Sequence, residues 1–444
     1  MRYRSVDGVV ADSVGQLISG PLLPRLDRLL RWASDVPEAD RSALVLDGVS
    51  RVVPEPPPLH ASWSNLDPDE AAAALLTQVR RAIERAVAGR ERVAIALGGV
   101  DSSVVLAVLR WACPDVRVEA FTLQFSGGDS DLPYATELCA SLDVPLHVVP
   151  TDQLDPTSAL VMDRRPFPSF GGCVDLEVAR AAKDRGFDVV LNGVYGDDVL
   201  GGPLQALGSS RLFHAPLAAI DCALRVEIPD SFSMWRRVRV FLVGGAARRL
   251  LPRFVSIARL ERSVRARYPW LTEEGWAVVR SGVPLLVDDV WRSVKRPADY
   301  YEMLLVGRAA LAMLDATQQM DVESGVHSAV PLGDPECVGF AAALPPELLS
   351  VDHRFRGLIR RAVRGLMPER VRLRSGKADA HGEVERVRSL AAEATRPYWE
   401  LPRLAAEGWV DPSAFRTQLE HHGAGDPRLW PFLAAEAFLD RECR

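Results

Sequence analysis

The strongest constraint on the fold is an alternation of short apolar runs with amphipathic stretches between residues 93 and 191. The run 93–97 (VAIAL) is continuously apolar, as expected for a strand buried on both faces of a parallel sheet. Further strand patterns lie at 116–125, 146–149 and 188–191, with helical patterns between them at about 102–111, 133–142 and 174–185. This alternation predicts right-handed βαβ units, and therefore an α/β domain whose helices cover a parallel sheet.

The flanking regions are expected to be less regular or mostly helical. A helix from residue 68 to about residue 88 is expected, because Asp67 provides an N-cap and Pro68 suits the first turn. Residues 1–64 are expected to be irregular apart from a short helix within 22–32, and residues 208–444 to be mostly helical. We therefore divide the chain into a short N-terminal segment, residues 1–64, and one large domain, residues 65–444.

Composition excludes several classes of function. A net charge of −6 gives no basic footprint for nucleic-acid binding. No clean apolar stretch reaches the roughly 18 residues of a membrane span, and the first residues lack the features of a signal peptide. The six cysteines are scattered without any CxxC pair, which argues against a zinc site or a disulfide framework. The expected location is the cytoplasm.

The first chemically informative segment, 97–103 (LGGVDSS), lies directly between a strand pattern and a helix pattern. Its two glycines allow the backbone to approach a ligand closely, and the helix N-terminus offers unpaired N–H groups to an anion. Ser102 and Ser103 add hydroxyls, and Asp101 can hold Mg²⁺ against phosphate oxygens. The segment is not a Walker A loop, because GxxxxGK[ST] is absent. On this pattern alone, an ordinary turn with Asp101 as a helix cap is an equal alternative.

The second segment, 191–202 (LNGVYGDDVLGG), follows the fourth strand pattern, at the edge where open parallel sheets bind their ligands. Its carboxylates, Asp197 and Asp198, are flanked by glycines and suit a second contact with a magnesium–phosphate group. Alone, this segment would favour an acidic, solvated loop. Together the two segments are far more specific, because both follow strands of one sheet.

Both segments resemble signatures of the asparagine synthetase family. Residues 97–103 resemble the SGGxDSS pyrophosphate loop of asparagine synthetase and β-lactam synthetase, and residues 191–202 resemble the family's SGxGxDExxGG segment. Three later segments follow in the family's order. Residues 330–345 resemble VPFLD…lP, residues 356–362 (RGLIRRA) resemble KxxLRxA, and residues 367–377 (MPERVRLRSGK) resemble LPxxVxxRxxK. The resemblance covers about residues 67–444.

The resemblance implies an adenine nucleotide α-hydrolase-like (PP-loop ATP pyrophosphatase) domain with largely helical C-terminal elaborations. It also implies ATP and Mg²⁺ as cofactors of a reaction that adenylates a carboxylate, releases pyrophosphate and lets an amine displace AMP. The implied metal ligands are Asp101 and Asp197, and the implied catalytic residues are Lys377 and Tyr195. Lys377 matches the lysine that contacts phosphate and stabilises the tetrahedral acyl-transfer state in relatives. The residues implied in nucleotide binding are Ile95, Leu97, Gly98, Gly99, Asp101, Ser102, Ser103, Leu123, Asn192, Gly193 and Arg356.

The chain departs from these signatures at several positions. Leu97 replaces the first serine of the loop, which removes one hydroxyl contact. The position that holds an acid–base residue in some relatives is occupied here by Val194. The neighbouring Tyr195 could take this role only if the loop shifts by one residue. In the family's ARVPFLD, the arginine is replaced by Ala329 and the leucine by Gly333. These departures weaken the case for aspartate as the substrate, and they leave open a catalytically impaired protein.

Other segments are similar to lasso peptide cyclases, which join a peptide's N-terminal amine to an Asp or Glu side chain. They are 131–135 (DLPYA), 269–271 (PWL), 375–378 (SGKA) and 404–412 (LAAEGWVDP). The expected substrate is therefore a peptide that is closed into a macrolactam, and a leader-peptide-processing protease is an expected partner. The alternatives are a small-molecule amide ligase of the β-lactam synthetase kind and a non-catalytic scaffold.

No glutaminase activity is expected. Full asparagine synthetases carry a cysteine nucleophile at position 2, where this chain has Arg2. Residues 1–64 are also too short for a glutaminase domain, so we expect them to be a remnant of one. The amine is then expected to come from free ammonia or from the substrate itself.

Overall fold

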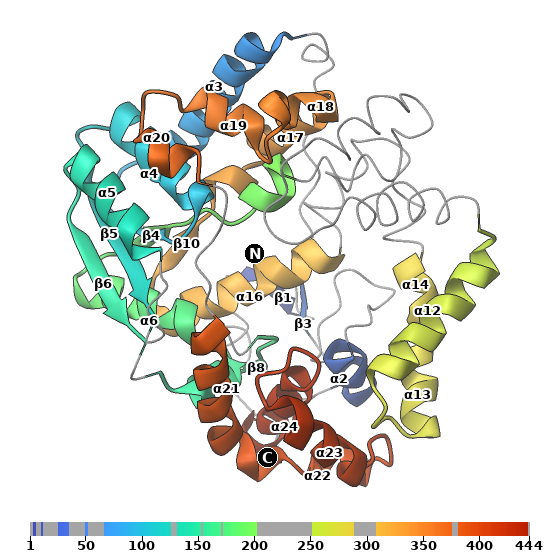
Figure 1. Cartoon of the computed structure of the whole chain (residues 1–444). Helices are drawn as coiled ribbons and strands as arrows, with labels where there is room; N and C mark the ends of the chain where they lie inside the picture. Colours follow the sequence, from blue (N-terminus) through green and yellow to red (C-terminus); the bar gives the residue numbers. More distant parts are fainter. Residues whose placement is uncertain are drawn as a thin grey trace.

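The structure is a computed structural model that describes residues 3–5, 10–11, 25–34, 49–51, 66–125, 131–151, 154–169, 172–201, 251–287, 308–374 and 381–442. Its central element is a five-stranded parallel sheet in the order β10-β9-β4-β5-β6 (Figure 1). The strands are β4 (Arg92–Leu97), β5 (Arg117–Gln124), β6 (Leu146–Pro150), β9 (Val189–Leu191) and β10 (His327–Ala329). The predicted α/β architecture is therefore confirmed.

Four of the five strands lie where the sequence predicts them. Strand β10 is absent from the prediction, because its three residues include His327 and Ser328 and lack the apolar run that marks a buried strand. Tertiary context forms it instead: the N–H of His327 donates to the carbonyl of Asp188 at 2.9 Å, and the N–H of Asn192 donates to the carbonyl of Ala329 at 3.0 Å. The antiparallel pair β7 (Val161–Met162) and β8 (Arg165–Pro166) is also unpredicted.

Helices cover both faces of the sheet. Helices α3 (Pro68–Ala86), α4 (Val100–Ala112) and α5 (Leu132–Leu142) pack on one face, and α6 (Gly172–Asp184) packs on the other. Every residue of α4 from Val100 to Leu109 is buried, because this helix lies between the sheet, α3 and α5. The expected N-cap of α3 is confirmed: the Asp67 carboxylate accepts from the N–H groups of Asp69 (2.8 Å) and Glu70 (2.9 Å).

A second hydrophobic core combines residues of the C-terminal part with residues of α2 (Leu26–Ala33), the 154–167 segment and α6. Its aromatic centre contains Trp270, Phe415 and Phe432, whose rings meet at centroid distances of 5.3 to 5.9 Å. Helix α16 (Arg308–Ser324) packs against α6 and β10, and so lies between the two cores. The remaining helices are α12 (Arg253–Arg267), α13 (Glu273–Arg280), α14 (Val283–Val287), α17 (Pro335–Ala343), α18 (Pro346–Leu349), α19 (Gly357–Ala362), α20 (Glu369–Arg372), α21 (His381–Thr395), α22 (Pro402–Ala406), α23 (Pro412–His422) and α24 (Trp430–Glu442).

The N-terminal region contains more structure than expected. The short helix predicted within 22–32 is present as α2 (Leu26–Ala33), and it packs against α24 and α13 (Figure 1). Three short strands, β1 (Tyr3–Ser5), β2 (Val10–Ala11) and β3 (Val49–Arg51), form an antiparallel sheet where an irregular chain was expected. No helix in the described ranges combines the length and apolar character needed to cross a membrane.

Candidate functional site

The candidate site lies where the strand order of the sheet reverses. From β4 the chain adds β5 and β6 on one side of the sheet, and later returns to place β9 and β10 on the other side. In open parallel sheets, the carboxyl ends of the strands at such a switch point form the ligand-binding crevice. The two glycine-containing segments follow β4 and β9, the neighbouring strands on either side of this switch point.

The loop after β4 is closed by its own hydroxyl groups. The hydroxyl of Ser102 accepts from the N–H groups of Gly98 (3.1 Å) and Gly99 (3.3 Å), and the hydroxyl of Ser103 donates to the carbonyl of Gly99 at 2.8 Å. The N–H groups of both glycines are thus satisfied within the loop. An incoming phosphate would replace the Ser102 hydroxyl as the acceptor for these N–H groups beside the helix N-terminus.

The loop after β9 packs directly on this first loop through glycines. A Cβ atom at Gly193 would lie 2.3 Å from the backbone nitrogen of Ser102, and one at Gly196 would lie 2.2 Å from Cγ of Asp101. A side chain at Gly193 would require a shift of the backbone at Ser102, and one at Gly196 would displace the Asp101 carboxylate. Residues Gly196–Leu200 then form a π-helical turn, a geometry that often marks functional sites.

An arginine joins the two loops. Nη1 of Arg356 donates to Oδ2 of Asp101 at 2.7 Å, and Nη2 of the same guanidinium pairs with Asp197. Arg356 is 5% exposed and Asp101 is 7% exposed, whereas the side chain of Asp197 is 44% exposed, so the network is buried at Asp101 and opens to solvent at Asp197. Three residues singled out from separate sequence segments therefore meet at one point.

The two carboxylates fit a magnesium site. Asp101 and Asp197 converge on one cationic position, and Mg²⁺ is commonly held by one or two carboxylates together with substrate phosphates and water. Among the described residues, no group of three or more His, Cys, Asp or Glu side chains could hold a metal ion on its own. A metal here would therefore depend on phosphate oxygens for its remaining ligands.

Arg374 and Asp131 form a further contact that sequence reasoning did not assign. Nη1 of Arg374 donates to the carbonyl of Gly98 at 3.4 Å, Nη2 pairs with Asp131, and the guanidinium carbon lies 4.2 Å from the ring centroid of Tyr134. Arg374 is 6% exposed, which indicates a fixed position over the first loop. The signal was available, because Arg374 stands at the arginine of the LPxxVxxRxxK pattern.

Arg360, also unassigned from the sequence, adds positive charge to the site. It is 6% exposed, and its guanidinium donates to the carbonyls of Phe355 (3.1 Å) and Arg372. Burial lowers the pKa of Arg360 to about 10, and the charge of Arg356 acts in the same direction, but the group stays protonated at neutral pH. No carboxylate in the described ranges lies within ion-pair distance of Arg360. A buried positive charge of this kind favours an anionic ligand nearby, such as a triphosphate.

Other residues implied in nucleotide binding lie apart. Ile95 is 0% exposed and Leu97 is 6% exposed, and both point into the core beneath α3 and α4. Leu123 is half-buried on the opposite face of the sheet. Ile95 pairs with Ala120 on the neighbouring strand, and side chains alternate between the two faces, so a residue three positions after Ala120 points to the other side. Strand alternation therefore sends the side chains of Ile95 and Leu123 to opposite faces of the sheet.

Tyr195 packs against the 329–335 segment. Its ring is 5% exposed and packs against Gly333, where an added Cβ would lie 2.6 Å from the ring. Burial raises the pKa of Tyr195 to about 12, and the charge of Asp198 acts in the same direction. Val194 is exposed, and the side-chain carbonyl of Asn192 accepts from its N–H at 3.1 Å. Lys377 lies outside the described residues.

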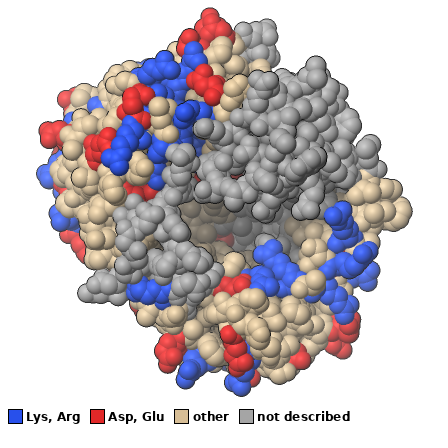
Figure 2. Space-filling view, viewed as in Figure 1, with Lys and Arg blue, Asp and Glu red and all other residues tan. Residues whose placement is uncertain are grey.

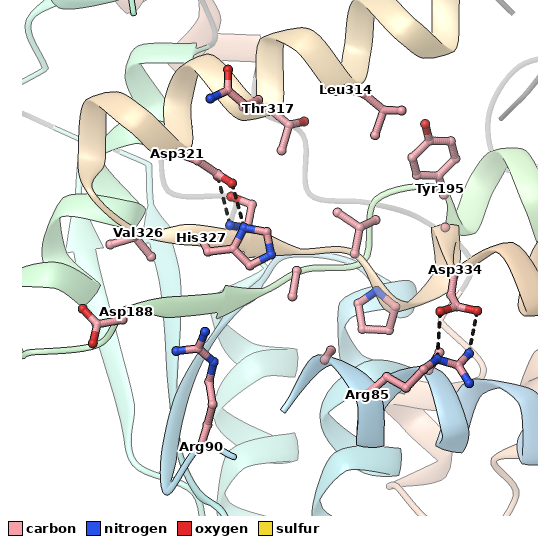
Figure 3. A pocket seen from close by; sticks show the side chains of 18 of the residues that line it. Arg85, Arg90, Asp188, Tyr195, Leu314, Thr317, Asp321, Val326, His327 and Asp334 are labelled. Atoms are coloured by element: carbon pink, nitrogen blue, oxygen red, sulfur yellow. Dashed lines mark hydrogen bonds and ion pairs between the residues drawn. The ribbon is translucent and has the colours of Figure 1, made fainter. Parts of the chain in front are cut away.

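A cavity of about 1000 Å³ lies between α16, β10 and the C-terminal end of α3. Its wall includes Tyr195 from the second loop and the 329–335 segment (Figure 3). Apolar side chains such as Leu314 and Val330 share the wall with the ion pair Asp334–Arg85 at 2.7 Å and with a contact of 3.1 Å between the Asp321 carboxylate and a ring nitrogen of His327. Figure 2 shows that Lys and Arg side chains gather on the molecular face over α19 and α20.

Comparison with known proteins assigns the chain to a family. Residues 74–440, most of the chain, match the family described as asparagine synthase. No curated protein matches the sequence. The matched range contains both loops, Arg356, Arg360 and Arg374, and this family forms amide bonds at the expense of ATP. The chain therefore belongs to the asparagine synthase family of ATP-dependent, amide-bond-forming ligases.

Proposed function

We propose that this protein adenylates a carboxylate of its substrate and joins it to an amine of the same substrate, with release of pyrophosphate and AMP. The convergence of Asp101, Asp197 and Arg356 beside the Gly98–Gly99 loop carries this proposal. It supplies two carboxylates suited to a phosphate-bound metal, with arginines nearby to neutralise a departing pyrophosphate. No Walker A lysine is present, and such a lysine is typical of enzymes that transfer the terminal phosphoryl group.

The reaction proceeds in two balanced steps. A carboxylate oxygen of the substrate bonds to the α-phosphorus of ATP, and the bond from that phosphorus to the bridging β-phosphate oxygen breaks, so that pyrophosphate leaves. The amine then bonds to the acyl carbon, loses a proton, and AMP leaves with the electron pair of the C–O bond. Arg356, Arg360 and Arg374 would stabilise charge on pyrophosphate, as fixed donors do for oxyanions elsewhere. Mg²⁺ held by Asp101 and Asp197 would neutralise phosphate charge.

We further propose that the substrate is a peptide that is closed into a macrolactam. A small-molecule ligase calls for an enclosed site, whereas a peptide needs a wide and partly apolar one. In support, a partly apolar cavity of about 1000 Å³ is lined by Tyr195 and the 329–335 segment, and Tyr195 belongs to the same loop as Asp197. The proposed role of Lys377, stabilisation of the tetrahedral acyl-transfer state, rests on its match to the family pattern alone.

The proposal is tested by identifying the nucleotide products formed from Mg·ATP and a peptide with a free N-terminus and an Asp or Glu side chain. We expect AMP and pyrophosphate, together with a peptide product lighter by one water. Acetylation of the N-terminus should abolish the ring while leaving exchange of labelled pyrophosphate into ATP. Glutamine should not stimulate the reaction. Formation of ADP and phosphate would refute adenylation.

A matched pair of variants tests the site itself. Asp197→Asn removes a carboxylate that pairs with Arg356 and should lower pyrophosphate release by about 10² or more, on the scale of losing one electrostatic stabiliser. Asp198→Asn changes the neighbouring residue of the same loop and should retain most of the activity. Equal losses in the two variants would show that the loop, rather than the Asp197 carboxylate, is what matters.

A further inference from the structure

The backbone around Arg356 is held in an unusual conformation. Arg356 has φ of 57°, and the nearby Asp352 and His353 have φ of 61° and 53°, in the left-handed region that side chains other than glycine rarely adopt. Gly357 fixes this arrangement, because a Cβ there would lie 1.9 Å from the carbonyl oxygen of Val351. Strain of this kind persists when the surrounding structure needs one side chain in one place. Here that side chain is the Arg356 guanidinium.

The ring of Phe355 packs beside the Arg356 guanidinium. The central carbon of the guanidinium lies 4.9 Å from the ring centroid of Phe355, and that ring fits only because residue 201 is glycine, where a Cβ would lie 2.4 Å from the ring. The two carboxylates it joins come from different loops, after β4 and after β9. Without a cation between them, two such carboxylates would repel each other at short range.

The Arg356 guanidinium thus occupies the position that a metal ion bridging Asp101 and Asp197 would take. We propose that Arg356 reserves this two-carboxylate site for metal that arrives with a nucleotide, and excludes free divalent cations. The inference rests on the proposed function, because it takes these carboxylates as the metal ligands. A free cation would have to break two charge-assisted pairs and leave a buried guanidinium without a partner. The triphosphate of Mg·ATP offers the guanidinium new anionic partners as the metal enters.

The shape of the side chain matters for this role. A planar guanidinium presents separate N–H groups to two carboxylates, whereas an ammonium group is a single point charge. The resembled KxxLRxA pattern has a lysine at this slot, where this chain has Arg356. Arg356→Lys is therefore expected to retain the charge but to hold the two carboxylates together less firmly.

The test measures binding of Mn²⁺ alone to the full chain, from the electron paramagnetic resonance signal of the free ion, without nucleotide. The wild-type protein should bind no Mn²⁺ at this site below about 1 mM, whereas Arg356→Gln should bind one ion at least about tenfold more tightly, in the range of two-carboxylate sites. Arg374→Gln is the matched control. It removes an equally buried arginine beside the same loop that pairs with one carboxylate, Asp131, and it should create no such site.

Circular dichroism shows whether each variant is folded. If Arg356→Gln is not folded, Arg356→Lys replaces it in the test. The lysine variant is expected to bind Mn²⁺ with an affinity between those of the wild-type protein and the neutral variant. Equal Mn²⁺ affinity in wild type and the Arg356 variant would overturn the inference. So would Mn²⁺ binding by Arg374→Gln as tight as that by Arg356→Gln. Because none of these measurements involves turnover, a wild-type protein that makes AMP and pyrophosphate yet binds Mn²⁺ alone would sink this inference while leaving the proposed function intact.

Discussion

Two departures from the family pattern compensate each other at the level of single residues. Tyr195 stands at the second glycine of SGxGxDE and has φ of 71°, the left-handed conformation for which glycine is the usual residue. Gly333 stands at the leucine of VPFLD, and its open position is filled by the Tyr195 ring. The side-chain volume lost in one segment is therefore supplied by the other. Mutual packing, rather than decay of the site, therefore explains why the chain has Tyr195 and Gly333 at these two positions.

A double-mutant cycle tests this exchange. Tyr195→Gly alone should destabilise the protein by about 3–5 kcal/mol through the cavity it leaves, reduced by about 1–2 kcal/mol of relieved backbone strain. Gly333→Leu alone should cost about 1–3 kcal/mol by overpacking against the ring. The double variant, measured by urea unfolding, should be more stable than the sum of the two changes by about 1 kcal/mol or more. Strict additivity would contradict the exchange, and near-normal turnover of the double variant would remove Tyr195 from the catalytic residues.

At the scale of elements, a buried glutamate ties two C-terminal helices together. Glu436 of α24 is 0% exposed, and its carboxylate accepts from the N–H groups of Arg403 (2.7 Å) and Leu404 (3.3 Å) in the first turn of α22. Burial raises the pKa of Glu436 above its usual value, against the opposing effect of these two donors. The folded protein therefore binds this proton more tightly than the unfolded chain does.

Stability should therefore depend on pH through Glu436. The stability that the raised pKa of Glu436 contributes is fully present below the pKa of this group in the unfolded chain, about 4.5. It is lost as the pH rises through the pKa of the folded protein. Glu436→Gln has no charge to bury, so urea unfolding at pH 5 and pH 8 should show its stability relative to wild type increasing with pH. The control is Glu442→Gln on the same helix, whose partly exposed side chain pairs with Arg164 at 2.9 Å. An unchanged difference at the two pH values would rule out this origin.

At the scale of the whole molecule, the N-terminal region and the C-terminal helices share one core. Leu29 and Leu30 of α2 are 0% exposed and belong to the same cluster as Trp430 and Phe438 of α24. The sequence-based boundary at residue 64 separates the regions along the chain, but this packing joins them in space. Helix α2 is therefore part of the structure that supports the ligase domain.

Leu30→Ala should lower the free energy of unfolding by about 2–5 kcal/mol, because it leaves a cavity in the shared core. Leu26→Ala, on the same helix but only partly buried, is the control and should cost less. The measurement is urea unfolding followed by tryptophan fluorescence, which reports on Trp270 and Trp430 inside this core. If α2 folded independently of the C-terminal helices, the main transition would be unaffected by Leu30→Ala.

The sequence was sufficient for the features encoded within short stretches of chain. The apolar run 93–97, the cap at Asp67 and the two glycine segments indicate local backbone geometry directly, and their strands and helices lie where expected. Strand β10 was missed because its pairing with β9, rather than any pattern in His327–Ala329, makes it a strand. The burial of Arg360 and Arg374 could not be predicted, because an arginine in a sequence carries no sign of whether it will be buried, although the family pattern marks the position of Arg374.

The sequence by itself determined the parallel α/β architecture, the order of the motifs and the two loops that approach the site. The tertiary structure alone decided that Arg356 lies between Asp101 and Asp197, and that the Tyr195 ring packs against Gly333. The physical reason is the range of the forces involved. Backbone propensity and hydrophobic periodicity act over a few residues, whereas ion pairing and close packing join residues that are hundreds of positions apart in the chain and become neighbours only after folding.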